Sequence, residues 1–278
     1  MTPIYLDNQA TTPLAPEVFD AMLPWLKDNF GNPHSPHMIG RRAAAAVEVA
    51  REQVAALLPQ NGRVIFTGSA TEAINLAFGA VRLRQGRDQI AVIDTEHAAV
   101  RDTALWYRTQ GFETTLLPVD RYGLIVLEEL EACLGPKTAL VGAMLVNNEI
   151  GVIQPVEQIA KMVHRAGALM LCDAVQGFGR IEIPQQADLI ALSGHKIYGP
   201  KGIGALWVRD GIDLPPLIHG GGQEQGVRSG TLSPALCVGL GAAAKLCADR
   251  RQEDMAHISN LASKAQSLFG DWTVNGSM

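Results

Sequence analysis

The chain has 278 residues, of which 47% are hydrophobic and 18% are charged, with a formal net charge of −5 at pH 7. This length fits one large α/β domain or one and a half average domains, and the apolar fraction is ample for a core. The mild acidity and the lack of a Lys/Arg cluster exclude an electrostatic surface for nucleic acid. No apolar run approaches the ~18 residues that span a bilayer, and residues 1–12 lack the basic start and apolar core of a secretory signal. The four cysteines form no Cys-x-x-Cys pair, so we expect reduced thiols in a cytoplasmic protein.

The N-terminal segment, residues 5–13, is polar and rich in turn-forming residues. A helix that opens on a proline is predicted over residues 16–29. Apolar residues at helical spacing predict a second, amphipathic helix over residues 41–58. Asp7 and Asn32 fit ordinary turn and cap chemistry as well as a role in a site, and the residues alone leave both interpretations open.

A strand predicted over residues 63–67 runs into a turn of small residues at 68–73, and the next helix is predicted over residues 74–83. A small-residue turn that leads into a helix leaves free N–H groups beside the positive end of the helix dipole, which suits a phosphate. The Ser, Thr and Glu of this turn also fit a plain capping box. The turn by itself does not decide between a cap and a phosphate site.

The next strand is predicted over residues 89–93, with His97 just past its exit and a helix over residues 98–110. His97 either caps this helix or lies flat against the ring of a ligand, and the local sequence favours the cap. A short strand at residues 113–117 and a helix at residues 126–134 follow.

Two further strands end in polar side chains. An apolar run at residues 138–146 ends in a pair of asparagines, and buried amides need polar partners. After a helix predicted over residues 156–166, a strand over residues 169–173 ends in an aspartate. Strands and helices that alternate at this interval predict a mostly parallel, doubly wound sheet.

The most informative stretch follows an apolar strand at residues 189–192. Residues 193–196 read Ser-Gly-His-Lys, and the glycines and proline after them force a tight turn. Burial of a lysine at this place would lower its pKa and free the amine to attack a carbonyl; the alternative is a surface lysine that suits a phosphate. Asp173 and Lys196 should project from the same sheet edge, where open α/β sheets bind ligands. A carboxylate that faces a pyridinium nitrogen and a lysine that holds an aldehyde are what pyridoxal phosphate (PLP) chemistry requires.

A strand at residues 203–208 and a long alanine-rich helix at residues 234–249 come next, with helices continuing through Leu268. Three glycines at residues 220–222, between this strand and this helix, permit a close backbone approach to a ligand or to another chain. A flexible linker is the alternative, although Arg228 between two glycines fits a linker poorly.

Residues 193–196, together with residues 173–176 (Asp-Ala-Val-Gln), resemble the cofactor site of the cysteine desulfurases, in the class V aminotransferase group of PLP enzymes. The resemblance extends from residue 4 to about residue 250. It implies the α/β fold of the type I PLP-dependent transferases, with a mostly parallel seven-stranded sheet flanked by helices and a C-terminal small domain that is largely absent. The implied division is an N-terminal arm at 1–15, a large PLP-binding domain at 16–250 and the start of a truncated small domain at 251–278.

The resemblance also implies a role for each matching residue. Lys196 would bind PLP and move the α-proton of the substrate, Asp173 would keep the ring nitrogen protonated, and His97 would stack on the ring and move protons. Asn148 would hydrogen-bond the phenolic oxygen of PLP. The other implied cofactor contacts are Ala70, Thr71, Ser193 and His195 on the phosphate, Gln176, and Thr231, which would reach the phosphate at the partner subunit's site in a homodimer.

The chain departs from the family pattern at several positions. Gln9 is a mild variation in the arm. Gln223 and Gln225 replace a usual His and Arg, which removes a formal charge near the entrance for substrate. No counterpart of the family's sulfur-accepting cysteine loop or of its carboxylate-binding arginine is found. Cys172 should face away from the cofactor, because neighbours on a strand point to opposite faces.

We therefore expect a PLP-dependent cysteine desulfurase that converts L-cysteine to L-alanine and passes the sulfur to an enzyme cysteine, for iron–sulfur cluster assembly or another sulfur carrier. This chain alone would bind the cofactor with little sulfur transfer. Its partners would be L-cysteine, a second copy of the chain, and a sulfur acceptor or scaffold protein, without metal, nucleic acid or membrane. The alternatives are a PLP-dependent cysteine or selenocysteine lyase, a class V aminotransferase, or an inactive PLP-binding assembly partner.

Overall fold

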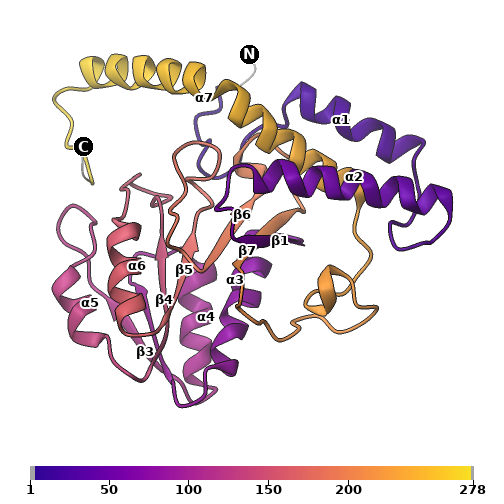
Figure 1. Cartoon of the computed structure of the whole chain (residues 1–278). Helices are drawn as coiled ribbons and strands as arrows, with labels where there is room; N and C mark the ends of the chain where they lie inside the picture. Colours follow the sequence, from indigo (N-terminus) through magenta and orange to yellow (C-terminus); the bar gives the residue numbers. More distant parts are fainter. Residues whose placement is uncertain (1–3, 277–278) are drawn as a thin grey trace.

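A computed structural model describes residues 4–276 and shows a mixed sheet of seven strands between two layers of helices (Figure 1). The first three residues of the expected arm and the last two of the expected small domain lie outside the described residues. The strand order is β1-β7-β6-β5-β4-β2-β3. The strands are β1 (Gly62–Thr67), β2 (Gln89–Ile93), β3 (Glu113–Leu117), β4 (Thr138–Met144), β5 (Leu169–Asp173), β6 (Leu189–Ser193) and β7 (Gly204–Arg209).

The sheet is mostly parallel, as the sequence predicts. Strand β2 pairs in parallel with β3 and β4, and β4–β5 and β5–β6 are parallel as well. Strand β7 runs antiparallel to both β1 and β6, which the sequence did not predict. The physical reason is the short link at residues 194–203, which holds no α-helix, because a parallel return needs a long crossover.

The helices are α1 (Pro16–Lys27), α2 (Met38–Ala55), α3 (Ala70–Phe78), α4 (Ala98–Arg108), α5 (Leu127–Cys133), α6 (Val156–Arg165) and α7 (Pro234–Leu268). The predicted start of α3 at residue 74 is wrong. This helix begins at Ala70, because the Ser69 hydroxyl accepts the Glu72 N–H at 3.2 Å and caps it. Its last predicted turn, Gly79–Leu83, is a short 3₁₀ helix.

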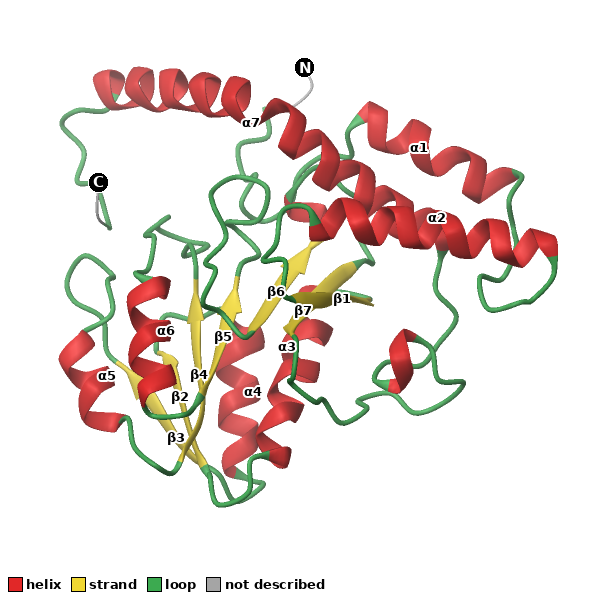
Figure 2. Ribbon diagram, in the orientation of Figure 1, coloured by secondary structure: helices red, strands yellow, loops and turns green. Residues whose placement is uncertain are grey.

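Helices lie on both sides of the sheet (Figure 2), and side chains of the strands alternate between two apolar layers. Helices α3 and α4 pack on one face, where Ile65 of β1 is buried. Helices α2, α5, α6 and the first half of α7 pack on the other face with Val64 and Phe66, and α1 lies against α7. Both faces of the central strands are therefore shielded, so that only their ends can meet a ligand.

Helix α7 is one continuous helix, so the expected boundary after residue 250 falls inside it. Its first half is packed in the core, whereas residues 252–275 are all exposed. Figure 1 shows this second half, in yellow, extending away from the rest of the molecule.

All four cysteines are free. Cys172, Cys237 and Cys247 are buried and Cys133 is half-buried. Within residues 4–276, no three His, Cys, Asp or Glu side chains are grouped so that they could hold a metal ion. No helix in this range has the length and apolar character needed to cross a bilayer.

Candidate active site

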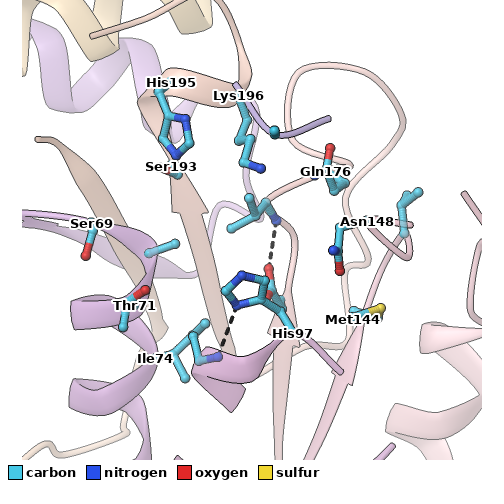
Figure 3. A pocket seen from close by; sticks show the side chains of 16 residues that line it. Ser69, Thr71, Ile74, His97, Met144, Asn148, Gln176, Ser193, His195 and Lys196 are labelled. Atoms are coloured by element: carbon cyan, nitrogen blue, oxygen red, sulfur yellow. Dashed lines mark hydrogen bonds between the residues drawn. The ribbon is translucent and has the colours of Figure 1, made fainter. Parts of the chain in front are cut away.

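A cavity of about 280 Å³ lies at the sheet edge where β4, β5 and β6 end (Figure 3). Its walls come from these strand ends, from the N-termini of α3 and α4, and from the N-terminal arm. This is the edge at which open α/β sheets bind ligands. Nine of the ten site residues predicted from the sequence line it, namely Ala70, Thr71, His97, Asn148, Asp173, Gln176, Ser193, His195 and Lys196.

Lys196 ends the short 3₁₀ turn (Gly194–Lys196) that follows β6. Its amine donates to the backbone oxygen of Gln9, and its own backbone oxygen accepts from Arg180 at 2.8 Å. Partial burial lowers the pKa of Lys196, although the field of the Asp173 carboxylate opposes the shift. The amine therefore loses its proton at a lower pH than a free lysine, which favours attack on a carbonyl carbon.

Asp173 ends strand β5 as a buried carboxylate, 6% exposed. One of its oxygens accepts the Val175 N–H at 3.0 Å, and the other has no hydrogen-bond partner among residues 4–276. Burial raises the pKa of Asp173, opposed by the Val175 bond and by the fields of His97 and Lys196. A buried carboxylate needs a charged donor, and a protonated pyridine nitrogen supplies one. Asp173 and Lys196 line one cavity, as binding of one small ring between them requires.

The predicted phosphate-binding turn is the N-terminus of α3. Ala70 and Thr71 open the helix and line the cavity together with its cap, Ser69. The first N–H groups of a helix have no partner within the helix and lie at the positive end of its dipole. Ser69 is thus both a cap and part of the cavity wall, so the two interpretations of this turn are compatible.

Ser193 and His195 approach the cavity from the end of β6. A ring nitrogen of His195 lies 3.1 Å from the Thr11 hydroxyl. Burial lowers the pKa of His195, and the charges of Lys196 and Lys201 lower it further. A neutral His195 keeps one ring N–H, which can serve as a donor to an anion.

Gly204, the first residue of β7, allows the α3 N-terminus to lie against the sheet. A Cβ atom at this position would come within 2.6 Å of the Ser69 carbonyl carbon and 2.8 Å of the Ala70 nitrogen. Both contacts are with backbone atoms, so the turn itself would have to move.

We therefore expect Gly204→Ala to weaken PLP binding by roughly 10-fold or more, because overpacking costs about 1–3 kcal/mol. Fluorescence titration with PLP measures the change. Gly135→Ala is the matched control, since a Cβ there meets nothing within 4 Å. Equal affinities of the two variants for PLP would contradict a role in PLP binding for the close approach of the α3 N-terminus to Gly204.

His97 caps a helix, as the local sequence favours, and it also lines the cavity. Its Nδ1 accepts the Ala99 N–H at 3.0 Å and caps α4, and the same ring lines the cavity. Figure 3 shows the ring between the sheet edge and the α3 side of the cavity. Capping fixes the orientation of the ring, while stacking on a cofactor stays a prediction.

The two asparagines after β4 have different surroundings. Asn147 is buried, donates to the Thr95 backbone oxygen at 3.1 Å and accepts the N–H groups of Glu149 and Ile150. Asn148 lines the cavity and donates to the Glu149 side chain at 2.8 Å. The first asparagine holds the loop, and the second is available to a ligand.

The N-terminal arm closes over the lysine turn. Gln176 donates to the Gln9 backbone oxygen at 2.8 Å, the same oxygen that accepts from Lys196. The Thr12 hydroxyl accepts the Tyr198 N–H at 2.7 Å and donates to the His195 backbone oxygen at 2.9 Å. Local sequence patterns gave no sign of these contacts, which join segments more than 160 residues apart.

Thr231, the tenth predicted residue, is exposed and does not line this cavity. Its role at a partner subunit's site stays a prediction. None of the four cysteines lines the cavity either. Cys172 packs in the core on the α2 and α6 side of the sheet, away from the cavity, as predicted.

Sequence reasoning missed Glu96. One oxygen of this buried carboxyl accepts the Met144 N–H at 2.6 Å, and the other has no partner among the described residues. Burial raises the pKa of Glu96 well above its usual range, with a further contribution from Asp173. The signal was an acidic residue directly before His97 at a strand exit. The other lining residues outside the prediction are Ala10, Ser69, Ile74, Ala99, Met144, Val146 and Val175.

Fold and site together define a PLP-dependent protein of the type I transferase fold, because the lysine amine, the unpaired carboxylate oxygen and the helix N-terminus match the aldehyde, ring nitrogen and phosphate of this cofactor. The family model described as "Aminotransferase class-V" matches residues 4–271. The chain belongs to the class V aminotransferase family.

Several curated relatives carry the name cysteine desulfurase. The chain is 46% identical over 271 residues to "Probable cysteine desulfurase, mitochondrial" of Schizosaccharomyces pombe, covering 94% of this chain and 54% of that protein. It is 46% identical over 268 residues to "Cysteine desulfurase IscS" of Rickettsia akari, covering 93% of this chain and 65% of that protein. The chain thus spans between half and two thirds of the length of these relatives.

Solved structures support the same fold. A "NIFS-LIKE PROTEIN" superposes with a TM-score of 0.90 at 37% identity, covering 95% of this chain and 74% of that one. "SspA in complex with cysteine" superposes with a TM-score of 0.82 at 38% identity, covering 87% and 72%. The type I fold expected from the sequence is therefore confirmed.

Proposed function

We propose that this chain is the PLP-binding part of a cysteine desulfurase that acts on L-cysteine. The observation that carries the proposal is the cavity shared by Lys196 and Asp173, in a chain whose relatives are named for this activity. In the overall reaction, L-cysteine and an acceptor thiol give L-alanine and a persulfide, so the sulfur leaves carbon and is bound by the acceptor sulfur.

The lysine and the aspartate have complementary roles in this proposal. PLP, when bound, supplies the electron sink that stabilises negative charge at the substrate Cα. Lys196 holds the cofactor aldehyde through its amine and later moves the proton at the substrate Cα; its lowered pKa keeps the amine able to accept that proton. Asp173 holds the proton on the ring nitrogen, and the buried setting strengthens this ion pair.

The remaining lining residues orient the cofactor. The first N–H groups of α3, with Ser193 and His195, bind the phosphate in this proposal. The His97 ring lies against the pyridine ring, held by its bond to the Ala99 N–H. Asn148 and Gln176 donate to the phenolic oxygen side of the ring.

The sulfur acceptor is proposed to lie outside this cavity, because no cysteine of the chain lines it. We further propose a homodimer in which Thr231 reaches the partner's site, a separate sulfur acceptor or scaffold protein that serves iron–sulfur cluster assembly, and a cytoplasmic location suited to four free thiols. The division into an arm (1–15), a large domain (16–250) and a further part (251–278) is also a proposal. It is supported by the full exposure of α7 beyond its first half.

The test is to titrate the purified chain with PLP, add L-cysteine and a thiol reductant, and measure alanine and sulfide. We expect saturable binding of one PLP per chain and slow formation of alanine from L-cysteine. No alanine should form when L-serine is supplied in place of L-cysteine. A protein that stays colourless with added PLP contradicts the proposal. Conversion of the cofactor to its pyridoxamine form favours an aminotransferase. Sulfide release without a persulfide on any thiol, measured with the reductant left out, favours a lyase. Bound PLP without turnover favours an assembly partner.

A further inference from the structure

The loop that follows β7 folds back on itself over residues 217–230, here called the 217–230 loop (Figure 1, orange). The Ser229 N–H donates to the Ile218 oxygen at 3.1 Å, and the Gly230 N–H donates to the Gln223 side chain at 2.8 Å. Glu224 and Gln225 both adopt positive φ, at 46° and 57°. Such backbone strain in two consecutive residues other than glycine persists only where surrounding contacts hold it.

Glu224 supplies one of these contacts, on strand β1. Its side chain is 3% exposed and accepts two hydrogen bonds from Arg51, both at 2.8 Å, and the Phe66 N–H at 2.7 Å. The Arg51 guanidinium also lies 4.7 Å from the centre of the Phe66 ring. A buried carboxylate with all of these donors is a firm anchor, and it fixes the 217–230 loop next to the exit of β1.

Arg228 supplies the second contact, on the phosphate-binding turn itself. Its guanidinium donates to both carboxylate oxygens of Glu72, at 2.7 and 3.3 Å. One of these oxygens also accepts the Gly68 N–H at 2.8 Å. A Cβ at Gly68 would lie 2.9 Å from this oxygen and 4.0 Å from Arg228, so the three groups are closely packed.

Glu72 therefore connects the 217–230 loop to the start of α3. It sits in the first turn of that helix, its N–H is bonded to the Ser69 hydroxyl, and Gly68 and Ser69 directly precede Ala70 and Thr71 in the cavity wall. Without Arg228, an uncompensated carboxylate would lie beside the helix end that is predicted to bind the anionic phosphate. Repulsion between the two negative charges would then oppose binding.

We propose that Arg228 is a positioning residue for the phosphate-binding turn, which acts through the Glu72 carboxylate on Gly68 and Ser69 without contacting the cofactor. This inference rests on the proposed function, because it assigns the α3 N-terminus to the phosphate of PLP. It explains why an arginine, rather than a flexible polar side chain, lies between Gly226 and Gly230: two parallel donors hold one carboxylate in a single orientation.

The test compares binding of PLP and of pyridoxal, which lacks the phosphate, by the chain of 278 residues. We expect Arg228→Met to raise the dissociation constant for PLP about 10-fold, within the range of measured couplings between contacting groups, and to change that for pyridoxal less than twofold. Arg209→Met is the control, since the Arg209 side chain is about as buried as that of Arg228 and pairs with Asp188 at the opposite end of the sheet. The ratio of the dissociation constants for PLP and pyridoxal distinguishes positioning of the phosphate-binding turn from a general loss of structure, which would weaken both ligands equally.

A double-mutant cycle with Glu72→Gln tests the route of the effect. If Arg228 acts through Glu72, adding Arg228→Met to Glu72→Gln changes the PLP to pyridoxal ratio less than twofold. Equal losses for both ligands, or a full additional loss in the double variant, overturn the inference. So does an effect of Arg228→Met that disappears in a Thr231→Ala background, which assigns it to Thr231 instead. A wild-type chain that binds neither ligand contradicts the proposed function rather than this inference.

Discussion

Lys196→Ala is expected to remove the covalent attachment of PLP and all turnover of L-cysteine. The amine of Lys196 is the only lysine amine that lines the cavity among the described residues, so no other side chain is placed to bond the aldehyde. Borohydride reduction followed by mass spectrometry of peptides measures the attachment. In the wild-type chain the reduced adduct should lie on Lys196, and in the variant no lysine should carry it.

Lys201→Ala is the matched control, because Lys201 is exposed on the same turn and outside the cavity. It should keep the adduct. The pH dependence gives a second check. Since burial lowers the pKa of Lys196, the neutral amine is present at a lower pH than for a free lysine, and attachment should reach its maximal rate at a correspondingly lower pH. An adduct that survives on another lysine, or a rate that follows the pH profile of free lysine, would refute the assignment.

Asp173→Asn is expected to lower turnover by about 10²–10⁴-fold, the usual contribution of a positioned acid or base. The amide keeps the size of the side chain and can still accept the Val175 N–H, but it has no charge to hold a proton on the ring nitrogen. Cofactor should therefore remain bound with altered absorbance while α-proton exchange in L-cysteine, followed by NMR in D₂O, slows.

Asp188→Asn provides the control for burial. Asp188 is another buried aspartate, 4% exposed, but it pairs with Arg209 and His164 at the beginning of β6, at the opposite end of the sheet. Its loss should lower the melting temperature and leave proton exchange in the folded protein unchanged. If both variants reduce exchange to the same extent, the effect is one of stability, and Asp173 has no special role.

Much of the site follows from simple local patterns. The runs at residues 169–173 and 189–192 are apolar over the length of one strand and then turn polar, which places Asp173 and Lys196 at strand ends. Because parallel strands end at the same edge of a sheet, the two side chains had to meet. The family resemblance added the roles of Asn148, Gln176 and His195, which the residues alone did not define.

Other features could not be read in this way. The burial of Glu96, for example, depends on its contact with Met144 of β4, 48 residues away in the sequence. Periodicity reports which face of an element is apolar, but not which element will pack against it. The start of α3 was misplaced for a related reason, since small polar residues such as Ser69 and Thr71 suit a turn, a cap or a first helical turn equally well.

The sequence by itself determined the class of fold and the sheet edge at which the cavity lies, because strand length, alternation with helices and polar strand ends are properties of short segments. Most of the nine predicted residues that line the cavity came from the family resemblance. Only the tertiary structure decided that the arm at Gln9 and Thr12 covers the lysine turn, that Gly204 lets the α3 N-terminus approach β7, and that Arg228 reaches Glu72. Arg228 and Glu72, for example, are 156 residues apart in the sequence. They depend on the geometry of the assembled sheet, which no local pattern contains.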